Sequence, residues 1–313
     1  MIKKEEGQMI ENKNILSPGI FLKNQIESAD SPIIALPASD SFTAMEAHKA
    51  GAQAIWVGSL ENSIRLGVPD SYVLGATDLF INLLSIQKLL LGKVSVVVDV
   101  DAGYGGINAT YNCFRGLNVL GVALGVMENK KSGIDKRNSI LGSKSTRWQK
   151  ESKNTMLEKL YAARKACDEI RRTLVGVRIE DLTMGYSVSE TLRTALFFEK
   201  AKPDLIIIHS NEKYPIRLLN FAREYSRVGK CPLATITTSF GRNIEKKELF
   251  KVGYKILIFS NQNVRSHLVT TIKYYKRLMR DRSAGGILDG EIATARDLIK
   301  LSDSLKVKIP KIR

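Results

Sequence analysis

Eight short runs of apolar and β-branched residues recur along the chain, separated by longer segments with helical periodicity. The runs are apolar throughout rather than alternating with polar residues, which is typical of strands buried on both faces of a parallel sheet. Between them, apolar residues recur every three to four positions, which predicts amphipathic helices. The predicted strands are 32–37, 52–59, 94–101, 121–128, 173–180, 204–210, 232–238 and 254–261, and the clearest predicted helices are 41–50, 78–91, 156–171, 187–200 and 214–228.

Eight strands alternating with helices predict a (β/α)₈ barrel of the TIM type, and 313 residues suit one such barrel with an added helix. An open doubly wound sheet is the alternative. It more often carries a glycine-rich turn after its first strand, where this chain has PASD at residues 37–40. We therefore expect a barrel domain over residues 31–283. Residues 1–30 are interpreted as a polar N-terminal extension, and residues 284–313 as a helical appendage with its helix at 289–305.

A long, polar and basic connection follows the fourth predicted strand, from residue 129 to about residue 153. In a compact domain, a connection of this length is usually either functional or disordered. It leaves the C-terminal end of a barrel strand, which is where TIM-barrel active sites are built. We therefore expect residues 129–153 to form a lid over the active site.

Composition indicates a globular protein in a reducing compartment. Hydrophobic residues make up 44% and charged residues 26% of the chain, which are ordinary values. The three cysteines, Cys113, Cys167 and Cys231, are spaced for neither a disulfide framework nor a zinc site. No signal peptide is apparent at the N-terminus, and no apolar stretch is long enough for a membrane span. A cytoplasmic protein with no membrane partner is expected.

The net charge of +16 is unusually high and is concentrated in two segments. Residues 242–313 contain 17 lysines and arginines against 7 acids, and residues 129–154 contain 8 against 2. A basic surface can bind polyanions, but no nucleic-acid-binding motif accompanies this one. A nucleic-acid partner is therefore disfavoured. A degenerate barrel that binds polyanions is kept as the alternative to an enzyme.

Acidic residues gather where the predicted strands end. Asp99 and Asp101 end the third strand, Glu128 ends the fourth, and Asp70 follows the second. Oxygen ligands without cysteine or clustered histidine suit Mg²⁺ or Mn²⁺, and such acids would repel one another without a cation. Acids in these loops also cap helices, but capping does not predict three of them at adjacent strand ends. The sequence therefore predicts a divalent metal site.

Two basic side chains end the next strands. Arg178 and His209 would supply positive charge and hydrogen-bond donors across the mouth of the barrel. Together with the backbone amides of Ser59 and Leu60, they could hold a phosphate or a carboxylate. The structural alternatives are an ion pair of Arg178 with Glu180 and a buried histidine that serves only packing.

These segments resemble the motifs of the phosphoenolpyruvate mutase/isocitrate lyase superfamily. Residues 99–105 (DVDAGYG) are similar to its metal motif, D-x-D-T-G-Y-G. Residues 55–71 resemble the mutase segment I-W-x-S-G-L…L-G-V-x-D-S, and the ends of strands five, six and eight match later motifs. The resemblance extends in order from residue 33 to residue 271 and implies the barrel fold.

The predicted lid separates the branches of this superfamily. Mutases and phosphonopyruvate hydrolases carry E-D-K-x₅-N-S, and this chain has ENK at 128–130 followed by NS at 138–139. Carbon–carbon lyases carry K-[KR]-C-G-H, whereas KR at 136–137 is followed here by NS. The resemblance is therefore closest to the phosphoenolpyruvate mutases. A phosphonopyruvate hydrolase, or a lyase or decarboxylase acting on a small 2-oxo or 2-hydroxy acid, is the alternative.

The resemblance implies a Mg²⁺-dependent interconversion of phosphoenolpyruvate and phosphonopyruvate, which forms a carbon–phosphorus bond. Asp99 would hold the metal directly, and Asp70, Asp101 and Glu128 would hold it largely through water. A small phosphorylated or phosphonate 2-oxo acid would be the substrate. Its binding is assigned to Trp56, Ser59, Leu60, Ser139 and Glu180, and catalysis to Arg178, His209, Asn138, Lys130 and Lys136.

Four departures from these motifs bear on the reaction. Asn129 replaces an aspartate, Ala102 replaces a threonine, residues 58–59 reverse the S-G order, and the lid is two residues longer. The superfamily also commonly exchanges its last helix between subunits. The resemblance therefore implies a homodimer or homotetramer in which the helix at 289–305 is swapped.

Overall fold

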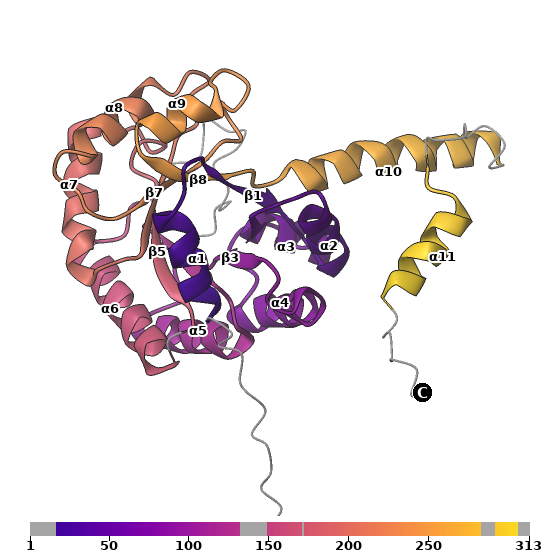
Figure 1. Cartoon of the computed structure of the whole chain (residues 1–313), viewed down its shortest axis with the longest axis horizontal. Coiled ribbons are helices and arrows are strands. Elements are labelled where there is room, and N and C mark those ends of the chain that lie inside the picture. The colour runs from indigo at the N-terminus through magenta and orange to yellow at the C-terminus, as the bar shows by residue number, and fades with distance from the viewer. Residues whose placement is uncertain (1–16, 132–148, 171, 283–291, 306–313) are drawn as a thin grey trace, which may run out of the picture. The chain divides into compact units, whose positions relative to one another are not determined.

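The computed structural model describes residues 17–131, 149–170, 172–282 and 292–305. The chain divides into two compact units, Met1–Val264 and Arg265–Arg313. In the first unit, eight parallel strands form a closed barrel in sequence order, with β8 paired to β1 (Figure 1). This confirms the predicted (β/α)₈ fold. The strands are β1 (Ile33–Pro37), β2 (Ala54–Val57), β3 (Ser95–Asp99), β4 (Leu124–Glu128), β5 (Leu174–Ile179), β6 (Leu205–His209), β7 (Leu233–Ile236) and β8 (Tyr254–Ile258).

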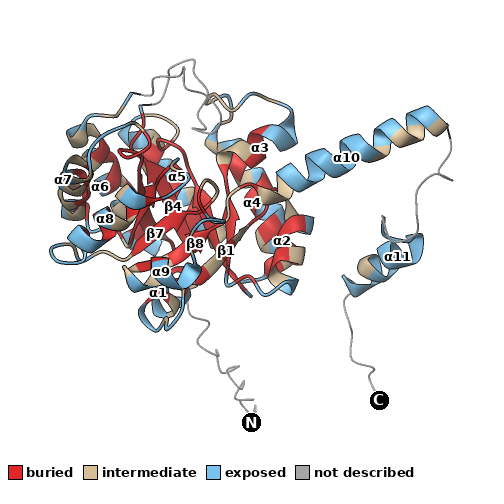
Figure 2. Cartoon of the chain, turned by 90° about the horizontal axis from the view of Figure 1, so that it is seen from above, coloured by how far each residue is buried: buried red, intermediate tan, exposed pale blue. Residues whose placement is uncertain are grey.

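Helices surround the barrel with their polar faces outward, as the exposed outer ring in Figure 2 shows. Local sequence fixes where several of them begin. In α2, for example, the Asp40 carboxylate accepts a hydrogen bond from the Thr43 backbone N–H at 2.8 Å, which satisfies an otherwise unpaired donor of the first turn. The ring consists of α2 (Ser41–Lys49), α3 (Ser59–Leu66), α4 (Ala76–Leu90), α5 (Ile107–Leu120), α6 (Lys153–Ile170), α7 (Val188–Phe198), the 3₁₀ helix η1 (Glu199–Ala201), α8 (Ile216–Tyr225) and α9 (Lys246–Lys251).

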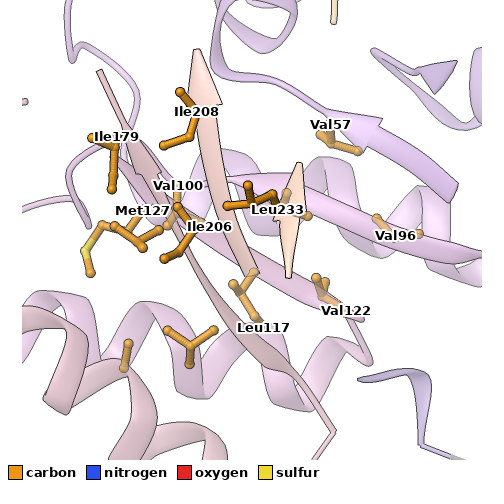
Figure 3. Packing of buried hydrophobic residues seen from close by; sticks show 14 of the residues in the cluster. Val57, Val96, Val100, Leu117, Val122, Met127, Ile179, Ile206, Ile208 and Leu233 are labelled. Carbon is orange, nitrogen blue, oxygen red and sulfur yellow. The ribbon is translucent and has the colours of Figure 1, made fainter. Parts of the chain in front are cut away.

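Side chains alternate between two apolar layers along each strand, as the two-residue period of a strand requires. The outer layer packs strands against helices. Figure 3 shows part of it, with Val57, Ile179 and Ile206 among the labelled residues. The inner layer fills the barrel and includes Val97 and Ile207. The interior is therefore a packed core below the mouth rather than a pore.

A short helix, α1 (Pro18–Glu27), closes the N-terminal end of the barrel. It begins with a Ser17 cap followed by proline, and the Gly19 N–H donates to the Arg172 carbonyl just before β5. Leu22 and Ile26, one helical turn apart, are buried in the inner layer. This helix lies within the stretch interpreted from sequence as a polar extension.

The second unit contains almost all of α10 (Gln262–Asp281) and the whole of α11 (Ala295–Ser304). α11 lies within the segment for which a C-terminal helix was predicted, and that helix is confirmed. No residue of either helix is buried. The exposed apolar side chains of α10 include Leu268, Ile272 and Tyr275. None of the helices in the described ranges is both long and apolar enough to cross a membrane.

Candidate active site

The strand period brings four charged side chains to the mouth of the barrel. Asp99, Glu128 and His209 each lie two residues after an inward-facing apolar residue of the same strand, and Arg178 follows Gly176 in the same way. Residues two apart on a strand face the same side of a sheet. All four side chains therefore emerge inside the barrel, at the C-terminal edge where barrel enzymes build their sites.

A cavity with about 470 Å³ of empty space opens at this edge. Predicted site residues from the five strands β2 to β6, from the start of α3 and from the segment after β4 surround it. Those that line it are Trp56, Ser59, Leu60, Asp99, Glu128, Lys130, Arg178 and His209. The structure also places four residues there that had not been assigned a role: Glu61, Thr238, Ser260 and Asn261.

Arg178 is the centre of the charge network. Its Nη1 donates to Asp99 Oδ2 at 2.7 Å and lies 3.5 Å from Glu128 Oε2, while its Nη2 forms an ion pair with Glu180. Burial alone would lower the pKa of Arg178, but Glu180, Asp99 and Glu128 hold it above its ordinary value. The guanidinium is thus permanently charged and shared among three carboxylates.

His209 is oriented from behind by Glu180. Its Nδ1 lies 3.1 Å from both Glu180 carboxylate oxygens, and it is also 3.3 Å from Arg178 Nη2. Burial opposes ionisation of Glu180, but Arg178 and His209 hold its pKa well below the usual range. A carboxylate accepts only, so Nδ1 carries the proton in this pair. His209 Nε2 has no hydrogen-bond partner among the described residues and is left for a ligand.

The acidic side of the cavity fits a hydrated divalent cation. Asp99 is buried, and its Oδ1 accepts no hydrogen bond from any described residue. Burial, with a smaller contribution from Glu128, raises the pKa of Asp99 to about 7 although Arg178 opposes the shift. Burial, Asp99 and Glu128 also raise the pKa of Asp101 well above its ordinary value. Added positive charge would relieve this strain.

Among the described residues, no three acidic, histidine or cysteine side chains converge closely enough to form a complete metal-ligand set. Mg²⁺ keeps several of its own waters and takes only one or two protein carboxylates, so it does not require such a set. Asp99 is the side chain with an open carboxylate oxygen. It is therefore the best placed to be a direct ligand, with the other acids acting through water.

Asp70 and Asp101 lie in an adjoining recess rather than on the cavity wall. They line it together with Ser59, Tyr72 and Tyr104. Asp101 and Tyr104 belong to a tightly turned loop beside the recess and have φ of 49° and 56°, values rare for residues other than glycine. Such strain persists only where the surroundings enforce it and is common at functional sites.

Packing from below holds this loop in place. Gly103 has φ of 86°, and a Cβ there would lie 2.4 Å from Thr110 Oγ1, so only glycine fits. Ala102, the residue that replaces the motif threonine, is buried, and its carbonyl accepts a hydrogen bond from the buried Lys159 Nζ at 3.0 Å. The loop is thus anchored to α6 by the backbone at position 102.

The base of the predicted lid is an antiparallel pair. Lys130 and Lys150 form a β-bridge, and the Glu151 N–H donates to the Asn129 carbonyl at 2.9 Å. Lys130 Nζ lies 2.8 Å from Glu128 Oε1, so the first arm of the base reaches the cavity. The predicted lid residues Lys136, Asn138 and Ser139 lie outside the described residues.

Asn129 has its own partners in this structure. Its Nδ2 donates to Asp181 Oδ1 at 2.8 Å, and its Oδ1 accepts from the Glu180 N–H at 2.9 Å. Asp181 also forms an ion pair with Lys150. The amide therefore connects the lid base to the strand end that carries Glu180, which gives the substitution of the motif aspartate a structural reason.

Glu61 and Asn261 are the least expected residues of the cavity wall. Glu61 lies in the first turn of α3, where an acid is ordinarily only a favourable partner of the helix dipole. Asn261 follows β8 and is 3% exposed, and its Oδ1 has no partner among the described residues. Its place at a strand end and the resemblance of the end of strand eight to a superfamily motif were the signals in the sequence that could have identified it.

Comparison with known proteins agrees with this architecture. The family model described as phosphoenolpyruvate phosphomutase matches residues 22–279. A phosphonopyruvate hydrolase from Variovorax sp. (strain Pal2) is 27% identical over 89% of this chain and 96% of its own, and a phosphoenolpyruvate phosphomutase from Tetrahymena pyriformis is 25% identical over 92% of each. A solved structure of a phosphonopyruvate hydrolase in complex with oxalate and Mg²⁺ superimposes with a TM-score of 0.81 at 22% identity, covering 92% of this chain and 96% of that one. Because the matched model covers the barrel and its charged mouth together, the chain belongs to the phosphoenolpyruvate phosphomutase family.

Proposed function

We propose that this protein catalyses the Mg²⁺-dependent interconversion of phosphoenolpyruvate and phosphonopyruvate. The observation that carries the proposal is the division of one cavity into an acidic side, with Asp99 and Glu128, and a donor side, with Arg178 and His209. A substrate with a 2-oxo acid at one end and a phosphoryl group at the other matches that division in charge.

The acidic side would bind the metal and the 2-oxo acid end. Asp99 would be the direct protein ligand, and Asp70, Asp101 and Glu128 would hold metal-bound waters. Mg²⁺ would offset the negative charge of an enolate formed when the phosphoryl group leaves. A related phosphonopyruvate hydrolase was solved in complex with oxalate and Mg²⁺, which supports the use of Mg²⁺ and of a ligand with such an oxo-acid end.

The donor side would bind the phosphoryl end. Arg178 carries a fixed charge, and a protonated His209 would donate from Nε2 to a phosphoryl oxygen while Glu180 stabilises its ring. The backbone amides at the start of α3, at Ser59 and Leu60, would add donors at a positive helix end. During the reaction the P–O bond to the enol oxygen breaks, its electron pair stays on that oxygen, and C3 then forms the P–C bond.

The test is ³¹P NMR of the purified protein with Mg²⁺ and phosphonopyruvate. Phosphoenolpyruvate should appear, and Asp99→Ala should lower its rate of formation by about 10³-fold or more, since one preorganised electrostatic group commonly contributes 10²–10³. Glu158→Gln, which removes an exposed acid of α6, is the matched control and should not change the rate. No change in the phosphonopyruvate signal would contradict the proposal.

Hydrolysis of phosphonopyruvate is the second candidate, favoured by the 27% identity to the Variovorax hydrolase. It requires the same binding groups and differs in that water, rather than the enolate carbon, accepts the phosphoryl group. The same spectra separate the two reactions, because hydrolysis gives inorganic phosphate and pyruvate without phosphoenolpyruvate.

We further propose that copies of the chain exchange their C-terminal helices. Support comes from the unburied apolar residues of α10, such as Leu268, Ile272 and Met279, which would be covered in a dimer or tetramer. Light scattering after size-exclusion chromatography should give at least a dimer at micromolar concentration, and a monomer would contradict the exchange.

A further inference from the structure

Glu61 is a buried acid on the cavity wall that the proposed mechanism does not use. It is the third residue of α3, follows the two residues whose amides would bind the phosphoryl end, and is 2% exposed. Glu61 lines the cavity, and its Oε1 accepts no hydrogen bond from any described residue. A buried polar atom is normally paired, so an open one at a cavity wall indicates a missing partner.

The reversed order of residues 58 and 59 is what makes room for this side chain. A Cβ on Gly58 would lie 2.4 Å from Glu61 Oε2 and 2.9 Å from Trp56 Nε1, closer than real Cβ atoms approach other atoms. A serine at position 58, as in the mutase motif, would therefore displace the carboxyl group. Gly58 and Glu61 act as one unit, and the departure from the motif gains a physical explanation.

The surroundings keep the carboxyl group protonated at neutral pH. Burial raises the pKa of Glu61 to about 8, and Asp99 and Asp70 raise it while Arg178 and a hydrogen bond to its own backbone lower it. A protonated carboxyl group has an O–H donor that a carboxylate lacks. At pH 7 and below, Glu61 is thus mostly protonated and presents an O–H donor to the cavity.

We propose that Glu61 is a specificity-determining residue whose carboxyl O–H donates a hydrogen bond to an oxygen of the substrate's phosphoryl or phosphonate group, beside the amides of Ser59 and Leu60. This inference rests on the proposed function, because it assumes a substrate with such a group at the end away from the metal. It assigns Glu61 to that end only. The affinity for a ligand that lacks the group should therefore not change when Glu61 is substituted.

The experiment measures, at pH 7 with saturating Mg²⁺, the KM for turnover of phosphonopyruvate and the inhibition constant of oxalate, which has no phosphonate group. Glu61→Ala should weaken phosphonopyruvate binding by about 10- to 100-fold, the range expected for a hydrogen bond to a charged group. Oxalate binding should change by less than about 2-fold, which also shows that the variant is folded. Glu61→Gln keeps a donor of the same length and should restore phosphonopyruvate binding to within about 5-fold of the wild type.

The pH dependence gives a second readout. As pH rises through about 8, Glu61 loses its proton and becomes a like charge facing the phosphonate, so wild-type affinity for phosphonopyruvate should fall between pH 7 and pH 9. Glu61→Gln cannot ionise and should lose that fall, while oxalate affinity follows the same profile in both proteins. A purely structural role would leave the two pH profiles for phosphonopyruvate alike.

Several results would overturn the inference. Equal losses for oxalate and phosphonopyruvate in Glu61→Ala, or a weaker Mg²⁺ affinity in Glu61→Gln, would make Glu61 a structural or metal-binding residue. Tighter phosphonopyruvate binding in Glu61→Ala would make it a repelling group. If the wild type does not turn over phosphonopyruvate, the proposed function fails as well, whereas unchanged selectivity in Glu61→Ala removes this inference alone.

Discussion

The lower and upper parts of the barrel interior are built by the same strands and from the same inward-facing positions, yet their chemistry is opposite. The lower part is built mainly from apolar side chains such as Val97, Ile207 and Leu22. Two residues further along, β3 and β6 carry Asp99 and His209. A step of two residues is about 7 Å along a strand. Over that distance the interior changes from apolar side chains, which need no hydrogen-bond or ionic partners, to charged side chains, which do.

The side chains of the two parts are almost equally buried, so the two parts differ in chemistry and not in exposure to solvent. Asp99 is 3% exposed and Arg178 is 8% exposed, close to the values of the apolar layer below. An apolar side chain contributes to stability by being buried, whereas a buried charge contributes only if an opposite charge compensates it. The upper part should therefore respond to loss of charge, and the lower part to loss of volume.

The largest effect is expected from Arg178→Gln. Three carboxylates, those of Asp99, Glu128 and Glu180, would lose their shared cation. Breaking a buried ion pair typically costs about 3–5 kcal/mol in the free energy of unfolding, and turnover should fall by about 10³-fold or more because the phosphoryl end loses its fixed charge. Urea unfolding and ³¹P NMR measure the two quantities.

Arg164→Gln is the control for Arg178→Gln. It removes an ion pair with Asp204 whose two side chains are 22% and 19% exposed, and which lies at the opposite end of the strands. We expect a loss of about 1 kcal/mol and unchanged turnover. Equal losses of stability in the two variants would show that the charged mouth is no more sensitive than an ordinary ion pair, and the contrast would fail.

The lower part is tested by Leu22→Ala in α1. Leu22 is fully buried in the inner layer, so truncation should leave a cavity and lower the free energy of unfolding by about 3 kcal/mol. The melting temperature would fall by roughly 6–12 °C for a domain of this size. Turnover at 25 °C should be unchanged, since no charged group of the mouth is touched.

Phe21→Ala, on the same helix, separates loss of the core from loss of the helix. Phe21 is 37% exposed, and its truncation should cost less than about 1 kcal/mol. A change in kcat or KM caused by Leu22→Ala, but not by Phe21→Ala, would show that the lower core affects the active site. It would contradict the separation of the barrel interior into a lower part that acts on stability and an upper part that acts on turnover.

The barrel and most of its charged mouth could be predicted from sequence because both follow from local order. Each strand appears as an apolar run, and the residue that ends the run is carried to the C-terminal edge whatever the rest of the molecule does. Asp99, Glu128, Arg178 and His209 end four such runs, so their convergence requires only a closed parallel sheet.

Glu61 and α1 could not be predicted in the same way, because their burial depends on tertiary packing. An acid in the first turn of a helix is ordinary on an exposed surface, and only the close approach of Gly58 and Trp56 shows that this one is enclosed. Similarly, the apolar residues of α1 occupy a short helix in which Leu22 and Ile26 are buried while Ile20 and Phe21 are exposed. An apolar pattern this short cannot distinguish a helix that closes the barrel from a polar N-terminal extension.

The smallest expected effect concerns Asn129, at the base of the predicted lid. In Asn129→Asp, the donor to Asp181 becomes a carboxylate facing another carboxylate, at a position where both side chains are buried. Lys150, already paired with Asp181, would compensate part of the added charge. We expect a loss of about 1–3 kcal/mol in the free energy of unfolding, measured by urea titration.

The double variant Asn129→Asp with Asp181→Asn decides whether that loss comes from this pair. It exchanges donor and acceptor and keeps one negative charge beside Lys150, so it should recover at least half of the stability lost in Asn129→Asp. Losses that simply add would show that the two side chains are not coupled. The mouth would then tolerate the motif aspartate at position 129, and this departure would have no structural cause in the Asn129–Asp181 hydrogen bond.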